Sequence, residues 1–238
     1  MDFDVYADNI VVMGSHWTGK TLFVSNALIK PRINYCNMWI WDYHGKITEY
    51  VQPSPHLIKY SIDELEYGTQ FLIPQEKSYK AFEKFLEKAL THNDLEITVD
   101  EAHNYSSAHR LKDNHAELIR NAQNKGVSYI EIFQRPQRVN GDVLENARHR
   151  FCFQLDDTNS VKKMREWIGA EIELHISPYN RSSTAKTVLP HIENNIEHSS
   201  EEARKYFEET NMLIDHSYVY RDKKQLRPQV INGGMKLN

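Results

Sequence analysis

The clearest chemistry in the sequence lies in eight residues near the N-terminus that fit the pattern G-x-x-x-x-G-K-[ST]. They are Gly14, Ser15, His16, Trp17, Thr18, Gly19, Lys20 and Thr21. In such a loop the glycines let backbone N–H groups turn inward around a phosphate, at the positive end of the next helix. Lys20 would reach the β- and γ-phosphates and Thr21 would bind Mg²⁺, so the stretch predicts a nucleotide site.

A second signal is a pair of adjacent carboxylates, Asp100 and Glu101, that ends the apolar run LEITV. Beside a phosphate loop, Asp100 is expected to hold the Mg²⁺ shell and Glu101 to polarise the attacking water. The second acid favours an ATP-hydrolysing motor over GTPase-like or kinase-like proteins. His103 follows in the segment DEAH, and we interpret it as a loop residue because it lacks an H-x-x-x-H partner.

A third polar point, Gln134, follows the run SYIEIF and precedes Arg135 and Pro136. An amide at the end of this strand would lie between the two nucleotide motifs and contact the γ-phosphate. An ordinary strand exit is the other interpretation of the same residues.

These residues need a scaffold that brings several strand ends together. Short β-branched or aromatic runs at 9–13, 38–41, 57–60, 69–73, 95–99, 127–133 and 151–155 predict strands. Helical spacing predicts helices at 20–29, 76–90, 115–124, 143–147 and 160–168. This alternation predicts an α/β fold, a mainly parallel sheet with helices on both faces.

The composition is that of an ordinary globular chain. Of 238 residues, 40% are hydrophobic and 26% charged, and the formal net charge is −4. An acidic N-terminus without an apolar run argues against a signal peptide, and two cysteines favour a reducing compartment, so we expect a cytoplasmic protein. Nucleic acid would have to bind to a local basic patch.

Taken together, five segments resemble the HerA/FtsK superfamily of DNA-pumping P-loop ATPases. They are GSHWTGKT, WIWDYHGKITEY, TVDEAHNY, NKGVSYIEIFQRP and NARHRFCFQLDDTNSVKKM, all within residues 9–168. The resemblance implies a RecA-like core, ATP with Mg²⁺ as cofactors, and a homo-oligomeric ring, a hexamer or pentamer, around double-stranded DNA. Only eight residues precede the first predicted strand, leaving no room for the β-barrel of cellular HerA proteins. The chain therefore looks most like viral genome-packaging ATPases, with a capsid or portal protein as a possible partner.

The same resemblance implies a catalytic arginine from a neighbouring subunit. Arg150 matches best, with Arg148 and Arg120 as alternatives. The family often has an arginine shortly before the glycine that corresponds to Gly126, and here Gln123 and Asn124 stand there. The Thr before its Gln-Arg-Pro segment is replaced by Phe133.

The predicted function is ATP-driven movement of DNA, without reading its sequence. Basic residues at 135–165 and the polar loop at 179–186 are candidate DNA contacts, although a solvated surface explains a charged run equally well. Alternatives are a motor for protein secretion or virion assembly and a module that binds ATP with little hydrolysis. We expect an ATPase core over residues 1–170 and a C-terminal extension over 171–238, with a late strand at 216–222 and a loose tail.

Overall fold

The computed structural model describes residues 8–16, 18–109, 111–153, 155 and 157–168 and the strands at 218–222 and 229–231. The described chain forms one sheet in the order β3-β4-β2-β5-β6-β1-β7-β8-β9. The strands are β1 (Ile10–Met13), β2 (Met38–Trp41), β3 (Ile58–Lys59), β4 (Gln70–Leu72), β5 (Glu96–Val99), β6 (Ser128–Phe133), β7 (His149–Phe153), β8 (Tyr218–Asp222) and β9 (Gln229–Ile231). From β3 to β7 all neighbours are parallel, and β8 and β9 are antiparallel additions.

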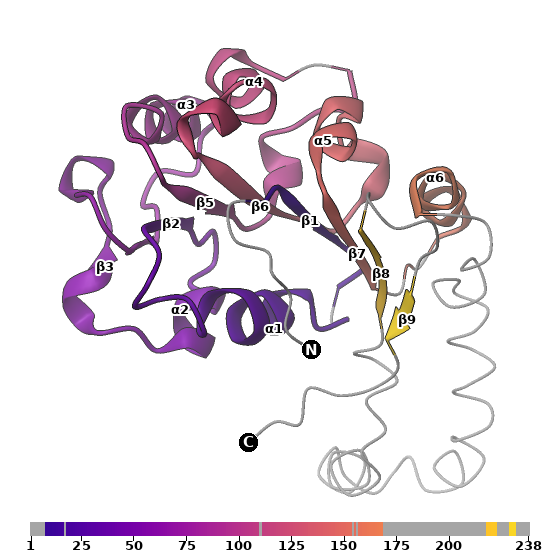
Figure 1. Ribbon diagram of the computed structural model, residues 1–238, viewed down its shortest axis with the longest axis horizontal. Coiled ribbons are helices and arrows are strands. Elements are labelled where there is room, and N and C mark those ends of the chain that lie inside the picture. The colour runs from indigo at the N-terminus through magenta and orange to yellow at the C-terminus, as the bar shows by residue number, and fades with distance from the viewer. Residues whose placement is uncertain are drawn as a thin grey trace, which may run out of the picture.

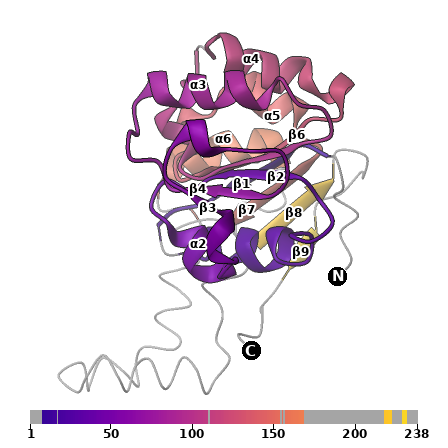
Figure 2. The ribbon, with the colours of Figure 1, turned by 90° about the vertical axis from the view of Figure 1, so that its left-hand side faces the viewer.

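Helices cover both faces of this sheet (Figures 1 and 2). They are α1 (Lys20–Phe23), α2 (Lys46–Val51), α3 (Tyr79–Ala89), α4 (Asp113–Arg120), α5 (Gly141–Asn146) and α6 (Thr158–Ile168). Side chains of α3, α4, α5 and α6 pack against one face, whereas α1 and α2 pack against the other. The mainly parallel α/β fold predicted from the sequence is therefore confirmed.

The central strands alternate strictly between these two cores. In β1, Val11 and Met13 join the core under α3 to α6, and Ile10 and Val12 join the core under α1 and α2. Because successive side chains of a strand point to opposite faces, a strand buried on both sides is a continuous apolar run. The run IVVM is such a strand, and all four of its residues are buried.

The main departures from the predicted elements concern three helices. Helix α2 was not predicted, because its six residues are too few for helical periodicity to be recognised. The predicted helix over 20–29 is α-helical only to Phe23 and continues as a π-helix over Val24–Ile29. The helix predicted from residue 76 begins at Tyr79, because the Ser78 hydroxyl accepts a hydrogen bond from the backbone N–H of Ala81 at 3.1 Å.

The C-terminal part contributes to the core sheet. The late strand expected at 216–222 is confirmed as β8, which pairs antiparallel with β7. Residues 171–217 and the predicted tail after residue 231 lie outside the described residues. A separate C-terminal extension over 171–238 thus stays a prediction, and the structure shows only that two strands from it extend the sheet.

Candidate nucleotide site

The predicted phosphate loop connects β1 to α1 at the carboxyl end of the parallel sheet. Gly14 leaves no room for a side chain, since a Cβ there would lie 2.6 Å from Cβ of Phe153 and 2.9 Å from Oγ1 of Thr18. The backbone N–H of Gly14 donates to the Phe133 carbonyl at 3.2 Å, and Oγ1 of Thr18 donates to the Ser15 carbonyl at 2.8 Å. These contacts fix the loop between β1, β6 and β7.

The lysine of the motif is held inside this loop. Gly19 has a φ of 90°, a left-handed conformation that glycine adopts without strain, and α1 begins directly after it. Nζ of Lys20 donates to the Ser15 carbonyl at 2.5 Å, and the side chain is buried. Of the other predicted ATP-binding residues, His16 is exposed at the loop surface, and Trp17 lies outside the described residues.

The three sequence signals meet in one pocket of about 510 Å³. Its lining is His16, Thr18, Gly19, Lys20, Thr21, Leu22, His44, Lys46, Tyr50, Asp100, Glu101, Ile132 and Gln134. Asp100 and Glu101 reach it because β5 lies next to β6, and Gln134 reaches it because β6 lies next to β1. Gly14 and Ser15 shape the loop behind the pocket.

Asp100 is a buried carboxyl, only 3% exposed. Burial raises its pKa to about 8, with further contributions from the negative charges of Glu101 and Asp42. Burial and nearby negative charge disfavour ionisation of Asp100, and a bound cation would favour it.

Glu101 has an unusual backbone, with a φ of 54°. Few residues other than glycine adopt this left-handed conformation, which is found at functional sites. Its two carboxyl oxygens face two groups of the same chain. Nε2 of Gln134 donates to Oε1, and Nδ1 of His103 lies 3.2 Å from Oε2.

Asp42, directly after β2, is an acidic residue for which no role was predicted from the sequence. Its Oδ2 accepts hydrogen bonds from the backbone N–H and the hydroxyl of Thr48, both at 2.7 Å, so it fixes the start of α2. That helix brings Lys46 and Tyr50 to the pocket. The signal that could have found Asp42 is its position directly after a strand whose neighbour in the sheet ends in Asp100.

The residues present fit a magnesium ion that is completed by a nucleotide. The hydroxyl of Thr21 and the carboxylate of Asp100 line the same pocket, and such hard oxygen ligands are those Mg²⁺ prefers. Within the described ranges no group of three or more His, Cys, Asp or Glu side chains could hold a metal by itself. Mg²⁺ usually takes one or two protein ligands with phosphate and water, and this site matches that pattern.

The structure does not favour Arg150 as the arginine that reaches a neighbouring subunit. Its side chain is only 6% exposed and is not among the residues that line the nucleotide pocket. It donates from Nη1 to the Trp167 carbonyl at 2.9 Å and from Nη2 to the Leu144 carbonyl at 2.6 Å. Arg150 thus fastens α5 and α6 to the sheet. The reason is its place on β7, which is covered on both faces.

The alternatives for that role, Arg148 and Arg120, are more accessible. Nη1 of Arg148 pairs with Asp8 at 2.5 Å, and its side chain is 30% exposed. Arg120 is 58% exposed and pairs with Asp142. No described contact connects either arginine to the pocket lining.

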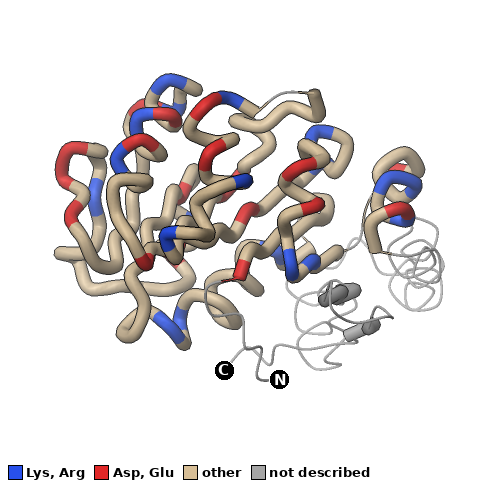
Figure 3. Tube along the Cα trace, turned by 45° about the horizontal axis from the view of Figure 1, so that its top comes forward, with Lys and Arg blue, Asp and Glu red and all other residues tan. Residues whose placement is uncertain are grey.

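The basic region at 135–165 is mixed in its environment. Arg135 and Arg138 are exposed beside the site, and their charges contribute to lowering the pKa of His103. Nζ of Lys163 instead donates to the Val139 carbonyl at 2.8 Å. Along the described chain basic and acidic positions are interspersed (Figure 3). The loop at 179–186 lies outside the described residues.

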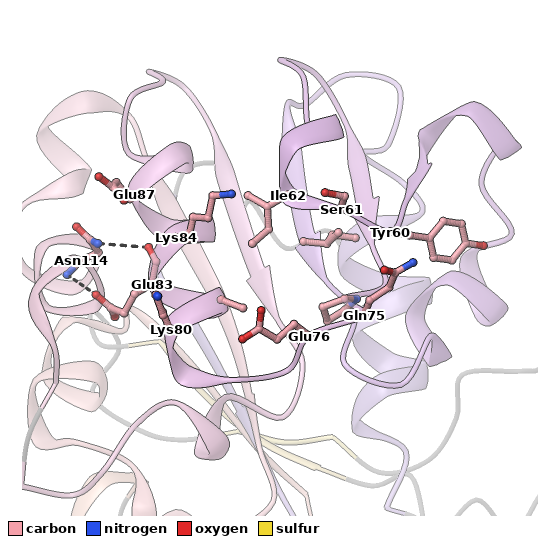
Figure 4. A pocket seen from close by; sticks show the side chains of 13 residues that line it. Tyr60, Ser61, Ile62, Gln75, Glu76, Lys80, Glu83, Lys84, Glu87 and Asn114 are labelled. Carbon is pink, nitrogen blue, oxygen red and sulfur yellow. Dashed lines mark hydrogen bonds between the residues drawn. The ribbon is translucent and has the colours of Figure 1, made fainter.

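A larger pocket, of about 640 Å³, lies away from these motifs, beside α3 (Figure 4). The Glu83 carboxylate accepts a hydrogen bond from the backbone N–H of Asn114 at 3.0 Å, and the Asn114 amide donates to the Glu83 carbonyl at 3.3 Å. Lys80, Lys84, Glu76 and Glu87 mix both charges along the lining. No phosphate loop borders it, so we place the functional site at the smaller pocket.

Several solved structures have the same fold as this chain over almost its whole length. The genome-packaging NTPase B204 from Sulfolobus turreted icosahedral virus 2, in complex with sulfate, is similar with a TM-score of 0.68 at 14% identity, over 99% of this chain and 100% of that chain. This chain shares its fold with that packaging NTPase. No protein-family model matches the sequence, and no curated protein matches it.

Two further structures agree. The DNA-packaging ATPase B204 from Sulfolobus turreted icosahedral virus has a TM-score of 0.65 at 16% identity, over 95% of this chain and 98% of that chain. The conjugation coupling protein TcpA of pCW3 has a TM-score of 0.53 at 11% identity, over 97% of this chain and 62% of that chain. The α/β fold implied by the sequence resemblance is thereby confirmed, and membership of the HerA/FtsK superfamily stays a prediction. In the described part of the chain, no helix has the length and apolar character needed to cross a bilayer.

Proposed function

We propose that this chain is an ATP hydrolase that drives double-stranded DNA through a ring of identical subunits, as a viral genome-packaging motor. One observation carries the proposal. The phosphate loop shares a single pocket with Asp100, Glu101 and Gln134, on a fold that matches a packaging NTPase over nearly its full length. A motor needs such a constellation because it must bind the triphosphate and also activate water.

Each side chain has a distinct role in the proposed reaction. The loop N–H groups and Lys20 bind the phosphates and stabilise the charge that develops on them during in-line attack. Thr21 and Asp100 would hold Mg²⁺, which when bound neutralises phosphate charge. Glu101 would accept a proton from the attacking water, and Gln134, which donates a hydrogen bond to Glu101, would contact the γ-phosphate.

The ring and its DNA complete the proposal. A neighbouring subunit would supply an arginine, for which Arg120 and Arg148 stay candidates after Arg150 is set aside. Contacts to DNA would be made by basic side chains with phosphates, without base recognition. We place the motor in the host cytoplasm or at the virion, where a capsid or portal protein would dock.

The test is ATP hydrolysis by the purified protein, with and without double-stranded DNA, at low and moderate salt. We expect stimulation by DNA that weakens as salt rises, because phosphate contacts are displaced by counterions. Lys20→Ala and Glu101→Gln should both abolish turnover. Hydrolysis unaffected by DNA would instead favour a motor that moves protein, and equal turnover by Glu101→Gln and the unaltered protein would overturn the mechanism.

A further inference from the structure

Each carboxyl oxygen of Glu101 has a side-chain nitrogen close to it in this structure. Oε1 accepts a hydrogen bond from Nε2 of Gln134, and Oε2 lies 3.2 Å from Nδ1 of His103. A carboxylate has about four lone-pair sites, so two remain for the attacking water. The group that would take the proton is therefore confined in orientation and still able to act.

His103 is fixed to Glu101 by the backbone as well. The 3₁₀ turn Ala102–Asn104 follows Glu101 directly, and the backbone N–H of Asn104 donates to the Glu101 carbonyl at 2.9 Å. Both side chains are 13% exposed. Within the described residues, Nδ1 of His103 makes no aligned hydrogen bond. Catalytic hydrogen bonds are often poorly aligned before substrate binds and tighten afterwards.

We propose that His103 is a positioning residue for Glu101, with a neutral imidazole whose Nδ1–H donates to Oε2 while Gln134 holds Oε1. This inference rests on the proposed function, because only the role of Glu101 as a base gives its orientation a catalytic consequence. The two donors, one directly after β6 and one in the turn after β5, would fix the plane of the carboxylate toward the γ-phosphate.

The surroundings of His103 favour the neutral ring. Burial lowers its pKa to about 4, and the nearby Arg138, Arg135, His16 and Lys20 act in the same direction. A neutral donor orients a carboxylate without cancelling its charge, whereas a cationic donor would stabilise the carboxylate and weaken it as a base. A histidine among cations therefore suits this position better than a lysine or arginine would.

The experiment compares two nearly isosteric replacements, His103→Asn and His103→Leu. The Asn amide can donate near the place of Nδ1, and Leu has almost the same shape without a donor. Because the ring is neutral and largely buried, both variants should fold, which melting temperatures would check. The readouts are kcat and KM for ATP and the affinity for a fluorescent ATP analogue, measured with Mg²⁺.

We expect His103→Leu to lower kcat by about 10- to 100-fold with nucleotide affinity unchanged, as for other misplacements of a catalytic group. His103→Asn should retain kcat within about threefold, since the donor is kept. Equal kcat in the two variants, whether both fall or neither does, would overturn the inference while leaving the proposed function standing. Loss of nucleotide affinity in Leu alone would also overturn it. If the unaltered protein does not hydrolyse ATP, the proposed function itself fails.

Discussion

Gln134 donates a hydrogen bond from Nε2 to Oε1 of Glu101, although the two residues are 33 positions apart in the chain. They meet because β5 and β6 are parallel neighbours in register, with Val99 beside Glu131, and each strand exits at the same edge of the sheet. The contact connects the residue proposed to activate water with the residue proposed to contact the γ-phosphate.

Replacing Gln134 by Leu should therefore lower turnover more than binding. We expect kcat for ATP to fall by about 10- to 100-fold, because the base loses one of its two orienting contacts. Nucleotide affinity should change little. Gln137 provides the control, since its amide donates to Asp157 at 2.8 Å, away from the pocket lining, and Gln137→Leu should keep normal kcat. A change confined to KM in Gln134→Leu would contradict the assigned role.

Asp100→Asn should stabilise the protein in the absence of nucleotide. Burial and the neighbouring acids raise the pKa of Asp100 to about 8, so the carboxylate costs free energy that an amide of equal size does not. We expect the free energy of unfolding to rise by roughly 1–3 kcal/mol. Urea unfolding measures this, and the added stability from Mg²⁺ with a non-hydrolysable ATP analogue should disappear. Lower stability without nucleotide would contradict the prediction.

Gly14→Ala tests the tight approach of the phosphate loop to β7. A Cβ at Gly14 would lie 2.6 Å from Cβ of Phe153, which cannot move without shifting the strand. We expect a loss of at least about 2 kcal/mol of stability, together with weaker nucleotide binding. Gly141, at the start of α5, has open space around the same position, so Gly141→Ala should stay within about 1 kcal/mol of the unaltered protein.

Arg150→Met separates a structural role from a catalytic one. Two carbonyls, those of Leu144 and Trp167, lose their donors, and the expected cost is roughly 2–4 kcal/mol of unfolding free energy. Hydrolysis per folded molecule should stay within about twofold. Lys84→Ala, which breaks an exposed ion pair with Asp63, should leave stability almost unchanged. Loss of hydrolysis at full stability would restore Arg150 as the arginine acting between subunits.

A pH dependence of stability should come from the buried pair of His115 and Glu131. Nε2 of His115 lies 2.5 Å from Oε1 of Glu131, and both side chains are fully buried. Burial alone would lower the pKa of His115, but the charge and hydrogen bond of Glu131, with smaller contributions from Glu83 and the Tyr105 backbone, together raise that pKa. The pair therefore contributes its full stability below pH about 6.5 and loses it as pH rises through the folded pKa.

Glu131→Gln is the matched variant for that measurement, because the amide keeps the size and removes the charge. Urea unfolding between pH 6 and pH 9 should show a steeper loss of stability in the unaltered protein than in Glu131→Gln. The variant itself should be destabilised by about 3–5 kcal/mol at pH 6, since a buried charge loses its partner. Parallel pH curves for the two proteins would show that His115 does not change charge in this range.

The features that depend on neighbouring residues in the chain could be predicted from the sequence. The phosphate loop, the acids after LEITV and Gln134 each follow a short apolar run, and the alternation of such runs with amphipathic segments requires a parallel sheet with two covered faces. Those strands were confirmed within a few residues because apolar runs and helix breakers act over neighbouring positions.

Side-chain environments that depend on residues from distant segments could not be predicted from the sequence and became visible in the three-dimensional fold. As a member of a basic run, Arg150 could be exposed or buried. In the structure it is buried, because it donates hydrogen bonds to the carbonyls of Leu144 in α5 and Trp167 in α6. The sequence predicted His103 to be a loop residue. In the structure, Glu101 has a left-handed backbone and Nδ1 of His103 lies 3.2 Å from its carboxylate. Asp42 fixes the start of α2 through its hydrogen bonds with Thr48, and α2 is too short for helical periodicity to predict it from the sequence. Side-chain environments of this kind depend on strand order and burial, and neither is written in the spacing of residues along the chain.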